Sequence, residues 1–336
     1  MRTFGACLLV ASACMVASCR CGSRDVKRLP DAAQPTASWQ LGNHCTKCLS
    51  ALELEASLRH GDFRVDAARV TAQGTSKPRK VRLVVPQGYA YFVKWKPAPA
   101  SGDESNNSPR RELAAYALQK LFLPPDRYVV PPTVMRCLRL DEAGSKLGAT
   151  GFRTWDCSLG VLSYWIEDTT ELLDAHIRDA NPALMGHVSD LNILTFLAGH
   201  RDSVGLNFLL HRASKRVFSV DNGMTFGAWE YNPIRLWTSD WSEVRVPGLR
   251  RNAVAKLRRL QRDDFDVLAV VAQLEERDGV LVPVDPAPPM DPESGVRFTD
   301  RVVQFGLTTK EIDEVHQRAG ELLNRVDDGS VALLPD

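Results

Sequence analysis

Apolar and polar residues alternate along the chain after residue 62, in short runs that turn-forming residues separate. Alternation with a period of two is typical of strands that bury one face in a core. Three of these runs follow one another across turns at 72–76 and 86–88, so we expect them to form an antiparallel sheet, and two later runs are further strand candidates. The predicted strands are 63–71, 80–85, 89–96, 128–140 and 159–166.

Other segments have the apolar spacing of helices. Residues 184–198 are apolar almost all round, which predicts a buried helix, and an apolar stripe predicts a second helix from Arg110 to the proline pair at 124–125. We also predict two short strands at 208–210 and 217–220. The remaining predicted helices are 49–58, 252–262, 265–276 and 308–326, the last capped by Thr309, with loops at 141–150 and 282–292.

Composition adds little to this picture. The chain has 336 residues, of which 44% are hydrophobic and 25% charged, which is ordinary for a soluble globular protein with a sizeable core. The formal net charge of +1 gives no global reason to expect nucleic acid or an anionic membrane surface as a partner.

The first residues have the pattern of a secretory signal, with a short basic start and an apolar run from Phe4 to Val16. The run is too short to span a bilayer as a helix. Its end, Val16-Ala17-Ser18-Cys19, resembles a bacterial lipobox. The resemblance implies a signal peptide at 1–18, lipid on Cys19 and a flexible tether at 19–44. Arg20 stands where an inner-membrane retention signal has Asp, which favours an exported lipoprotein of the outer membrane, facing the periplasm or the cell surface.

The cysteines outside this signal suit an oxidising compartment. Cys45 and Cys48 form a C-x-x-C after His44, which indicates either a local disulfide or half of a zinc site; a disulfide is favoured because the chain has no second C-x-x-C. Cys137 with Cys157 is a plausible second bridge, which leaves Cys21 unpaired in the tether.

The segment 200–223 carries the candidate chemistry. It reads His200-Arg201-Asp202, then Asn207, then the two short strands, then Asp221-Asn222-Gly223. The carboxylate of Asp202 could accept a proton from a hydroxyl nucleophile, and Asn207 and Asp221 could hold divalent cations between them.

This order and spacing resemble the protein kinase-like superfamily, whose catalytic loop H-R-D-x-x-x-x-N precedes a D-x-G metal loop. Asn222 replaces the Phe of conventional kinases, which is closer to the atypical kinases: the secretory-pathway (Golgi casein kinase) group, the HipA-type kinases and the phosphatidylinositol 4-kinase-like enzymes. The resemblance implies an α+β, bilobal protein kinase-like fold. Its small antiparallel-sheet N-lobe, with an N-terminal extension, would occupy 45–166 and its mainly helical C-lobe 167–336.

The same resemblance implies roles for residues outside the central segment. The turn at Gly74, Thr75 and Ser76 would lie over the ATP phosphates. Lys94, with Lys96 in reserve, would bind the α- and β-phosphates, and Glu112 would orient that lysine, although an exposed salt bridge is the alternative for Glu112. The hinge residues that would meet adenine are Trp165 and Ile166, with ordinary core packing as the alternative for Trp165.

The resulting hypothesis is a kinase that uses ATP and Mg or Mn to phosphorylate a hydroxyl group, first of protein Ser or Thr, and otherwise of a sugar or small molecule. The competing class is a catalytically inactive kinase-like lipoprotein that binds nucleotide or protein. A hydrolase built from Ser203, His200 and Asp202 is a poor third reading, because neighbours on one loop rarely face one another as a triad must.

Overall fold

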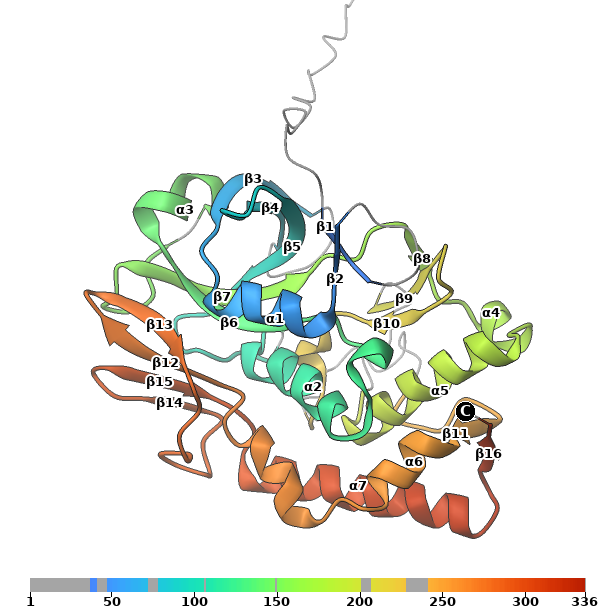
Figure 1. The fold of residues 1–336 in the computed structure, drawn as a ribbon. Helices are drawn as coiled ribbons and strands as arrows, with labels where there is room; N and C mark the ends of the chain where they lie inside the picture. Colours follow the sequence, from blue (N-terminus) through green and yellow to red (C-terminus); the bar gives the residue numbers. More distant parts are fainter. Residues whose placement is uncertain are drawn as a thin grey trace, which may run out of the picture. The chain divides into compact units, whose positions relative to one another are not determined.

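The computed structural model describes residues 37–40, 47–71, 78–105, 107–148, 150–200, 207–227 and 241–335 (Figure 1). The predicted signal peptide, Cys19 and nearly all of the predicted tether lie outside these residues, as do Cys21, His44 and Cys45. Among the described residues, no helix combines the length and the apolar character needed to cross a bilayer.

A five-stranded antiparallel sheet follows the N-terminal extension, in the order β3-β4-β5-β7-β6. All five predicted strands are therefore confirmed, four of them with shifts of one or two residues, whereas the strand predicted from residue 128 begins only at Thr133. The strands are β3 (Arg64–Val70), β4 (Arg79–Val84), β5 (Ala90–Pro97), β6 (Thr133–Arg139) and β7 (Cys157–Tyr164).

The central strand β5 divides its side chains between two environments. Tyr91, Val93 and Trp95 are fully buried in the core of the sheet. Lys94 and Lys96 alternate with them and therefore lie on the opposite face. The period-two pattern of this strand thus places both lysines on one side.

The N-terminal extension packs on this sheet. Strand β1 (Ala37–Trp39) pairs in parallel with β2 (Lys47–Leu49), and the predicted helix follows as α1 (Ala51–His60). Ser50 caps α1 in a capping box with Glu53. Figure 1 shows α1 beside the strands β6 and β7.

Two disulfides bear on the cysteine predictions. Cys137 and Cys157 are bonded, so the predicted bridge is confirmed, and it joins the neighbouring strands β6 and β7. Cys48 is also disulfide-bonded. Its predicted partner, Cys45, lies outside the described residues. A disulfide at Cys48 agrees with the favoured reading of the C-x-x-C and not with a zinc site.

Helix α2 (Pro109–Phe122) follows β5 and packs against β6 on one side and against α6 on another. Figure 1 shows it between the five-stranded sheet and the long helix α7. The short turn η1 (Pro125–Arg127) follows it. The prediction of a loop at 141–150 is wrong, because α3 (Leu140–Leu147) forms there and ends at Gly148 in the left-handed conformation.

The rest of the chain combines helices with short strands. The predicted buried helix is α5 (Pro182–Leu197), and the predicted short strands are β9 and β10, which β8 joins in a three-stranded sheet. The remaining elements here are β8 (Thr169–Glu171), α4 (Asp174–Arg178), β9 (Phe208–His211), β10 (Val217–Ser219), η3 (Asn222–Met224), β11 (Gly248–Arg250), α6 (Arg251–Leu257), α7 (Thr309–Asp327) and β16 (Ala332–Leu334).

A further antiparallel sheet, in the order β13-β12-β15-β14, was not predicted. The prediction of a helix at 265–276 is wrong, because a 3-10 turn, η5 (Arg262–Leu268), leads into β12 (Ala272–Arg277). Strand β12 pairs on both edges, and residues that lie beyond it in the sequence supply those partners. Its other strands are β13 (Val280–Val284), β14 (Val296–Phe298) and β15 (Val302–Phe305).

Three smaller predictions also need correction. Helix α6 ends at Leu257, well before residue 262, and β13 takes up the start of the predicted loop at 282–292. The cap of α7 is Thr308, one residue before the predicted Thr309, and it forms a capping box with Glu311. The predicted α+β fold class is nevertheless confirmed: a five-stranded antiparallel sheet is followed by helices and smaller sheets.

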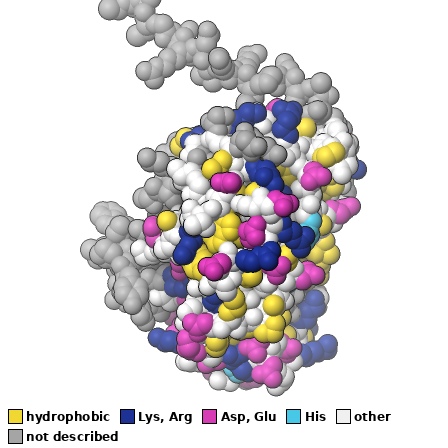
Figure 2. All heavy atoms as spheres, turned by 90° about the vertical axis from the view of Figure 1, so that its left-hand side faces the viewer, with side chains coloured by type: hydrophobic (Ala, Val, Ile, Leu, Met, Phe, Trp, Pro, Cys, Tyr) yellow, Lys and Arg dark blue, Asp and Glu magenta, His cyan; other side chains and the backbone are white. Residues whose placement is uncertain are grey.

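Figure 2 shows basic and acidic side chains interspersed over one face of the molecule. No single sign of charge dominates the coloured part of that face, in keeping with the balanced composition of the chain.

Candidate functional site

The lysines of β5 meet two acidic side chains from distant parts of the chain. Lys96 Nζ lies 3.0 Å from Oε1 of Glu112 and 3.0 Å from Oδ1 of Asp221. Lys94 Nζ lies 3.2 Å from the same oxygen of Asp221 and 4.0 Å from Oε1 of Glu112. The lysines predicted to bind phosphate, their predicted glutamate partner and a predicted metal ligand therefore form one cluster.

The two lysines differ in burial. The side chain of Lys96 is 4% exposed and that of Lys94 is 18% exposed, while that of Asp221 is 41% exposed. Lys96 is thus enclosed by its two carboxylate partners, whereas Lys94 and Asp221 retain contact with solvent. The reserve candidate makes the tighter contact with Glu112, and Lys94 stands at the open side of the cluster.

Glu112 links the sheet to the loop that carries Asp221. It lies in the first turn of α2 and is buried. Its Oε1 accepts a hydrogen bond from Lys96, and its Oε2 accepts one from the backbone N–H of Asn222 at 3.3 Å. The alternative of an exposed salt bridge does not describe this residue.

Electrostatics in the cluster favour the charged forms. Burial disfavours ionised Asp221, but Lys94 and Lys96 outweigh it and hold the pKa of this carboxyl well below its ordinary value. Burial likewise disfavours a charged Lys96, but Glu112 and Asp221 raise the pKa of its ammonium above the ordinary value. Both groups therefore stay ionised across the physiological range.

The backbone at Asp221 is held in an unusual conformation. Its φ of 61° and ψ of 53° lie in the left-handed region, which a non-glycine residue adopts only at a cost. Gly223, two residues on, approaches the cluster so closely that a Cβ there would lie 3.3 Å from Nζ of Lys96. The Asp-x-Gly spacing thus has a steric reason in this fold.

Asn222, the departure from conventional kinases, is a buried anchor of this loop. Its Oδ1 accepts a hydrogen bond from Oγ of Ser219 at 2.7 Å, and its backbone carbonyl accepts one from Oγ1 of Thr225 at 2.7 Å. Sequence reasoning assigned Asn222 no such role. The nearby hydroxyl residues Ser219 and Thr225 could have indicated this role, because a buried amide needs polar partners.

Asn207, the second predicted metal ligand, is brought next to Asp221 by the β9–β10 hairpin. The backbone N–H of Val220 donates to the carbonyl of Asn207 at 2.8 Å, so Asn207 lies across from the residue that precedes Asp221. Asn207 itself is buried. His200, at the end of α5, is buried against Phe208, while Arg201, Asp202 and Ser203 lie outside the described residues.

The donor set at Asn207 and Asp221 suits Mg or Mn only in part. In the described ranges, no group of three or more His, Cys, Asp or Glu side chains could hold a metal ion. One carboxylate and one amide fit a magnesium ion that takes its remaining ligands from water and phosphate, as is usual in nucleotide sites. They do not form an all-protein cage.

The predicted hinge follows β7. The backbone N–H of Trp165 donates to the carbonyl of Phe92 at 2.9 Å, and Ile166 is buried. The ammonium of Lys80 lies 4.8 Å from the centre of the Trp165 ring and 4.4 Å from that of Phe92. Lys80 is the direct cross-strand neighbour of Lys94, so it extends the basic face of the sheet toward the hinge. Sequence reasoning missed Lys80, which the alternation of β4 could have indicated.

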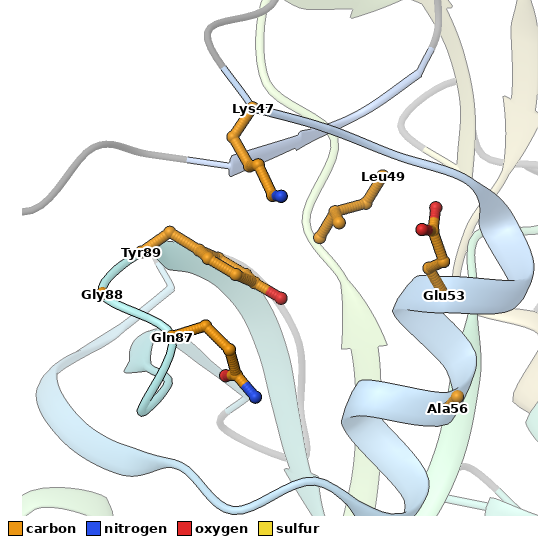
Figure 3. A pocket seen from close by; sticks show the side chains of 7 residues that line it. All are labelled: Lys47, Leu49, Glu53, Ala56, Gln87, Gly88 and Tyr89. Atoms are coloured by element: carbon orange, nitrogen blue, oxygen red, sulfur yellow. The ribbon is translucent and has the colours of Figure 1, made fainter.

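The predicted phosphate turn at Gly74, Thr75 and Ser76 lies outside the described residues, as does most of the tryptophan-rich segment after Gly227. A hollow of about 530 Å³ lies elsewhere, between β2, α1 and the β4–β5 turn (Figure 3). Figure 3 shows Lys47 and Tyr89 at its rim facing Glu53 of α1. None of the predicted site residues lines this hollow.

No protein-family model matches the chain, and no curated protein matches it. One similar solved structure is that of hydra Fam20 with sugar, at 15% sequence identity and a TM-score of 0.49. The match covers 85% of this chain and 92% of the hydra chain. At this identity and TM-score the likeness assigns no activity, so function has to be argued from the geometry of the site itself.

Proposed function

We propose that this protein is an ATP-dependent phosphotransferase that transfers the γ-phosphoryl group to a hydroxyl acceptor, with protein Ser or Thr as the first candidate. The observation that carries the proposal is the convergence of Lys94, Lys96, Glu112 and Asp221. Phosphoryl transfer depends mainly on positioned charges, and two lysines held beside a carboxylate that could bind a metal ion would supply such charges.

The two lysines suit different tasks in this proposal. Lys96 is enclosed by Glu112 and Asp221 and keeps the cluster assembled, while Lys94 is more exposed and can turn its ammonium toward phosphate oxygens. Asn207 and Asp221 would hold Mg or Mn, which neutralises phosphate charge when bound. Lys94 thus stays the predicted phosphate-binding lysine, and Lys96 stays the reserve candidate.

The remaining roles rest on the sequence. Asp202 would accept the proton of the attacking hydroxyl, while the oxygen of that hydroxyl bonds to the γ-phosphorus and ADP leaves. Gly74, Thr75 and Ser76 would bond phosphate oxygens, and Trp165 and Ile166 would meet the adenine. The position of Lys80 against the Trp165 ring supports a polar edge to that adenine site.

We further propose that the protein works outside the cytoplasm, anchored through lipid on Cys19. The disulfide of Cys137 with Cys157 and the bonded state of Cys48 support an oxidising compartment. In this proposal residues 1–18 are the signal peptide, 19–44 the tether, and 45–166 and 167–336 the two lobes.

Incubation of the purified protein with labelled ATP and Mn, followed by mass spectrometry of the labelled species, tests the function. We expect Asp202→Ala and Asp221→Asn to abolish transfer, because one removes the base and the other a charged metal ligand. Arg262→Gln, at an exposed ion pair on η5, is the matched control and should keep wild-type transfer.

Wild-type turnover in either site variant would contradict the assigned roles. A manganese-dependent thermal shift with ATP but no labelled product would instead favour the inactive nucleotide-binding alternative. The chemical nature of the labelled species distinguishes a protein acceptor from a sugar or a small molecule.

A further inference from the structure

The first turn of α2 carries a second ion cluster, centred on Arg110, two residues before Glu112. Arg110 donates from Nη1 to Oε2 of Glu311 at 2.6 Å and from Nη2 to Oε1 at 3.0 Å. Its Nε also donates to Asp103 at 2.6 Å. Arg110 and Glu311 are both buried, so this two-bonded pair is shielded from water.

Glu311 is itself fixed at the amino end of α7. Its Oε2 accepts from the backbone N–H of Thr308 at 2.9 Å, and its own N–H donates to Oγ1 of Thr308 at 3.2 Å. Arg111 adds a further ion pair to Oε1 of Glu311 at 3.1 Å. The carboxylate therefore cannot follow α2 if that helix moves, because the capping box ties it to α7.

The space around Arg110 is also closed. A Cβ at Gly295, just before β14, would lie 2.5 Å from Nε of Arg110. Burial disfavours a charged Glu311, but the hydrogen bonds and charge of Arg110 outweigh it and lower the pKa of this carboxyl. The pair is thus ionised, and the backbone of Gly295 packs closely against Arg110.

We propose that Arg110 and Glu311 are positioning residues for the nucleotide site: they fasten the first turn of α2 to α7 and so keep Glu112 within bonding distance of Lys96. This inference rests on the proposed function for its consequence in catalysis. Its structural content, the dependence of the Lys96 environment on Glu311, is independent of turnover. The site is preassembled, and the C-terminal helix is part of what assembles it.

The test measures the rate at which an amine-acylating reagent labels Lys96, read by mass spectrometry without nucleotide. In Glu311→Gln the amide can still form the capping box but the charged partner of Arg110 is lost. We expect the labelling rate of Lys96 to rise about tenfold, because the local opening that exposes Lys96 would then break one charge-assisted hydrogen bond fewer. Labelling of exposed Lys310 should stay constant.

The matched control is Asp313→Asn, which removes a carboxylate from the same helix and breaks an ion pair with Arg262 of η5 instead of α2. It should leave the Lys96 rate unchanged. Arg110→Lys is the second variant, since it keeps the charge and loses the two-bonded geometry. It should also raise the labelling rate of Lys96, and it provides the test if Glu311→Gln does not fold. Unchanged Lys96 labelling in a folded Glu311→Gln or Arg110→Lys protein would overturn the proposal.

Kinetics separate this inference from the proposed function. If the protein transfers phosphate, Glu311→Gln should raise KM for ATP more than Asp313→Asn does. If the wild type transfers no phosphate but Lys96 still becomes reactive in Glu311→Gln, the proposed function fails and the positioning role stands. If the wild type transfers phosphate but the labelling rate of Lys96 is unaltered in Glu311→Gln, the positioning role fails and the proposed function stands.

Discussion

Replacing each lysine of β5 with methionine should reveal how unequal their structural roles are. Methionine matches the length of the lysine stem, so neither variant opens a large cavity. In Lys96→Met, buried Glu112 loses its partner at 3.0 Å, and the nearest remaining ammonium is Lys94, at 4.0 Å. In Lys94→Met, Asp221 keeps Lys96 at 3.0 Å and Glu112 keeps its shorter contact.

The expected magnitudes follow from burial. Removing one member of a buried ion pair costs about 3–5 kcal/mol, and Lys94 offsets part of that loss, so Lys96→Met should lower the free energy of unfolding by about 3 kcal/mol. The half-exposed contact of Lys94 with Asp221 is worth about 1 kcal/mol or less. The difference between the two variants should therefore be about 2 kcal/mol.

Urea denaturation at neutral pH, with the disulfides kept oxidised, measures both values. The slope of the free energy against urea should be the same for both variants, since neither changes the area exposed on unfolding. Equal destabilisation, or a greater loss in Lys94→Met, would refute the assignment of Lys96 as the enclosed partner of Glu112. Under the proposed function, both variants should also lose the thermal shift with ATP.

Three further outcomes can be checked. Burial, helped by nearby arginines, lowers the pKa of His187 to about 4. The contribution of His187 to stability should therefore be constant above the ordinary histidine pKa, fall as the pH drops toward 4 and level off below, and His187→Gln should remove that part of the fall in a urea series across pH. Gly306→Ala should lower the melting temperature and cost about 1–3 kcal/mol, because a Cβ there would overlap the backbone carbonyl of Ala269, and a neutral result would contradict the tight packing. Replacing Cys137 and Cys157 together with alanine should cost about 3 kcal/mol in urea unfolding, given a loop of 20 residues, without abolishing manganese-dependent ATP binding.

Local patterns account for much of the fold. The alternation along β5 was enough to place Lys94 and Lys96 on one face, because successive side chains of a strand point to opposite sides. The hairpin between Asn207 and Asp221 was likewise readable, since two short apolar runs with turn residues between them have few other ways to pair. These features depend on neighbours in the sequence, and the structure confirms both strands.

Where the partners of a segment lie far along the chain, local pattern was insufficient. Residues 265–276 have an apolar spacing that suits a helix, yet β12 forms because strands β13 and β15 pair with both of its edges. Backbone hydrogen bonds to later strands outweighed a weak local preference. The loop predicted at 141–150 was wrong for a different, local reason: Gly148 acts as a helix C-cap, and the turn-forming residues around it were interpreted as a loop.

For this protein, the sequence alone determined the five strands of the first sheet, the buried helix α5, the shared face of the two lysines and the spacing of the Asn207 and Asp221 loop. Only the tertiary structure decided which lysine Glu112 holds, since that depends on where α2 lies against the sheet. Helix α2 is in turn bonded to α7 through buried Arg110 and Glu311, which are about 200 residues apart. Pairings of that separation leave no periodic trace in a sequence, because the energy that selects them comes from packing and desolvation in the folded chain.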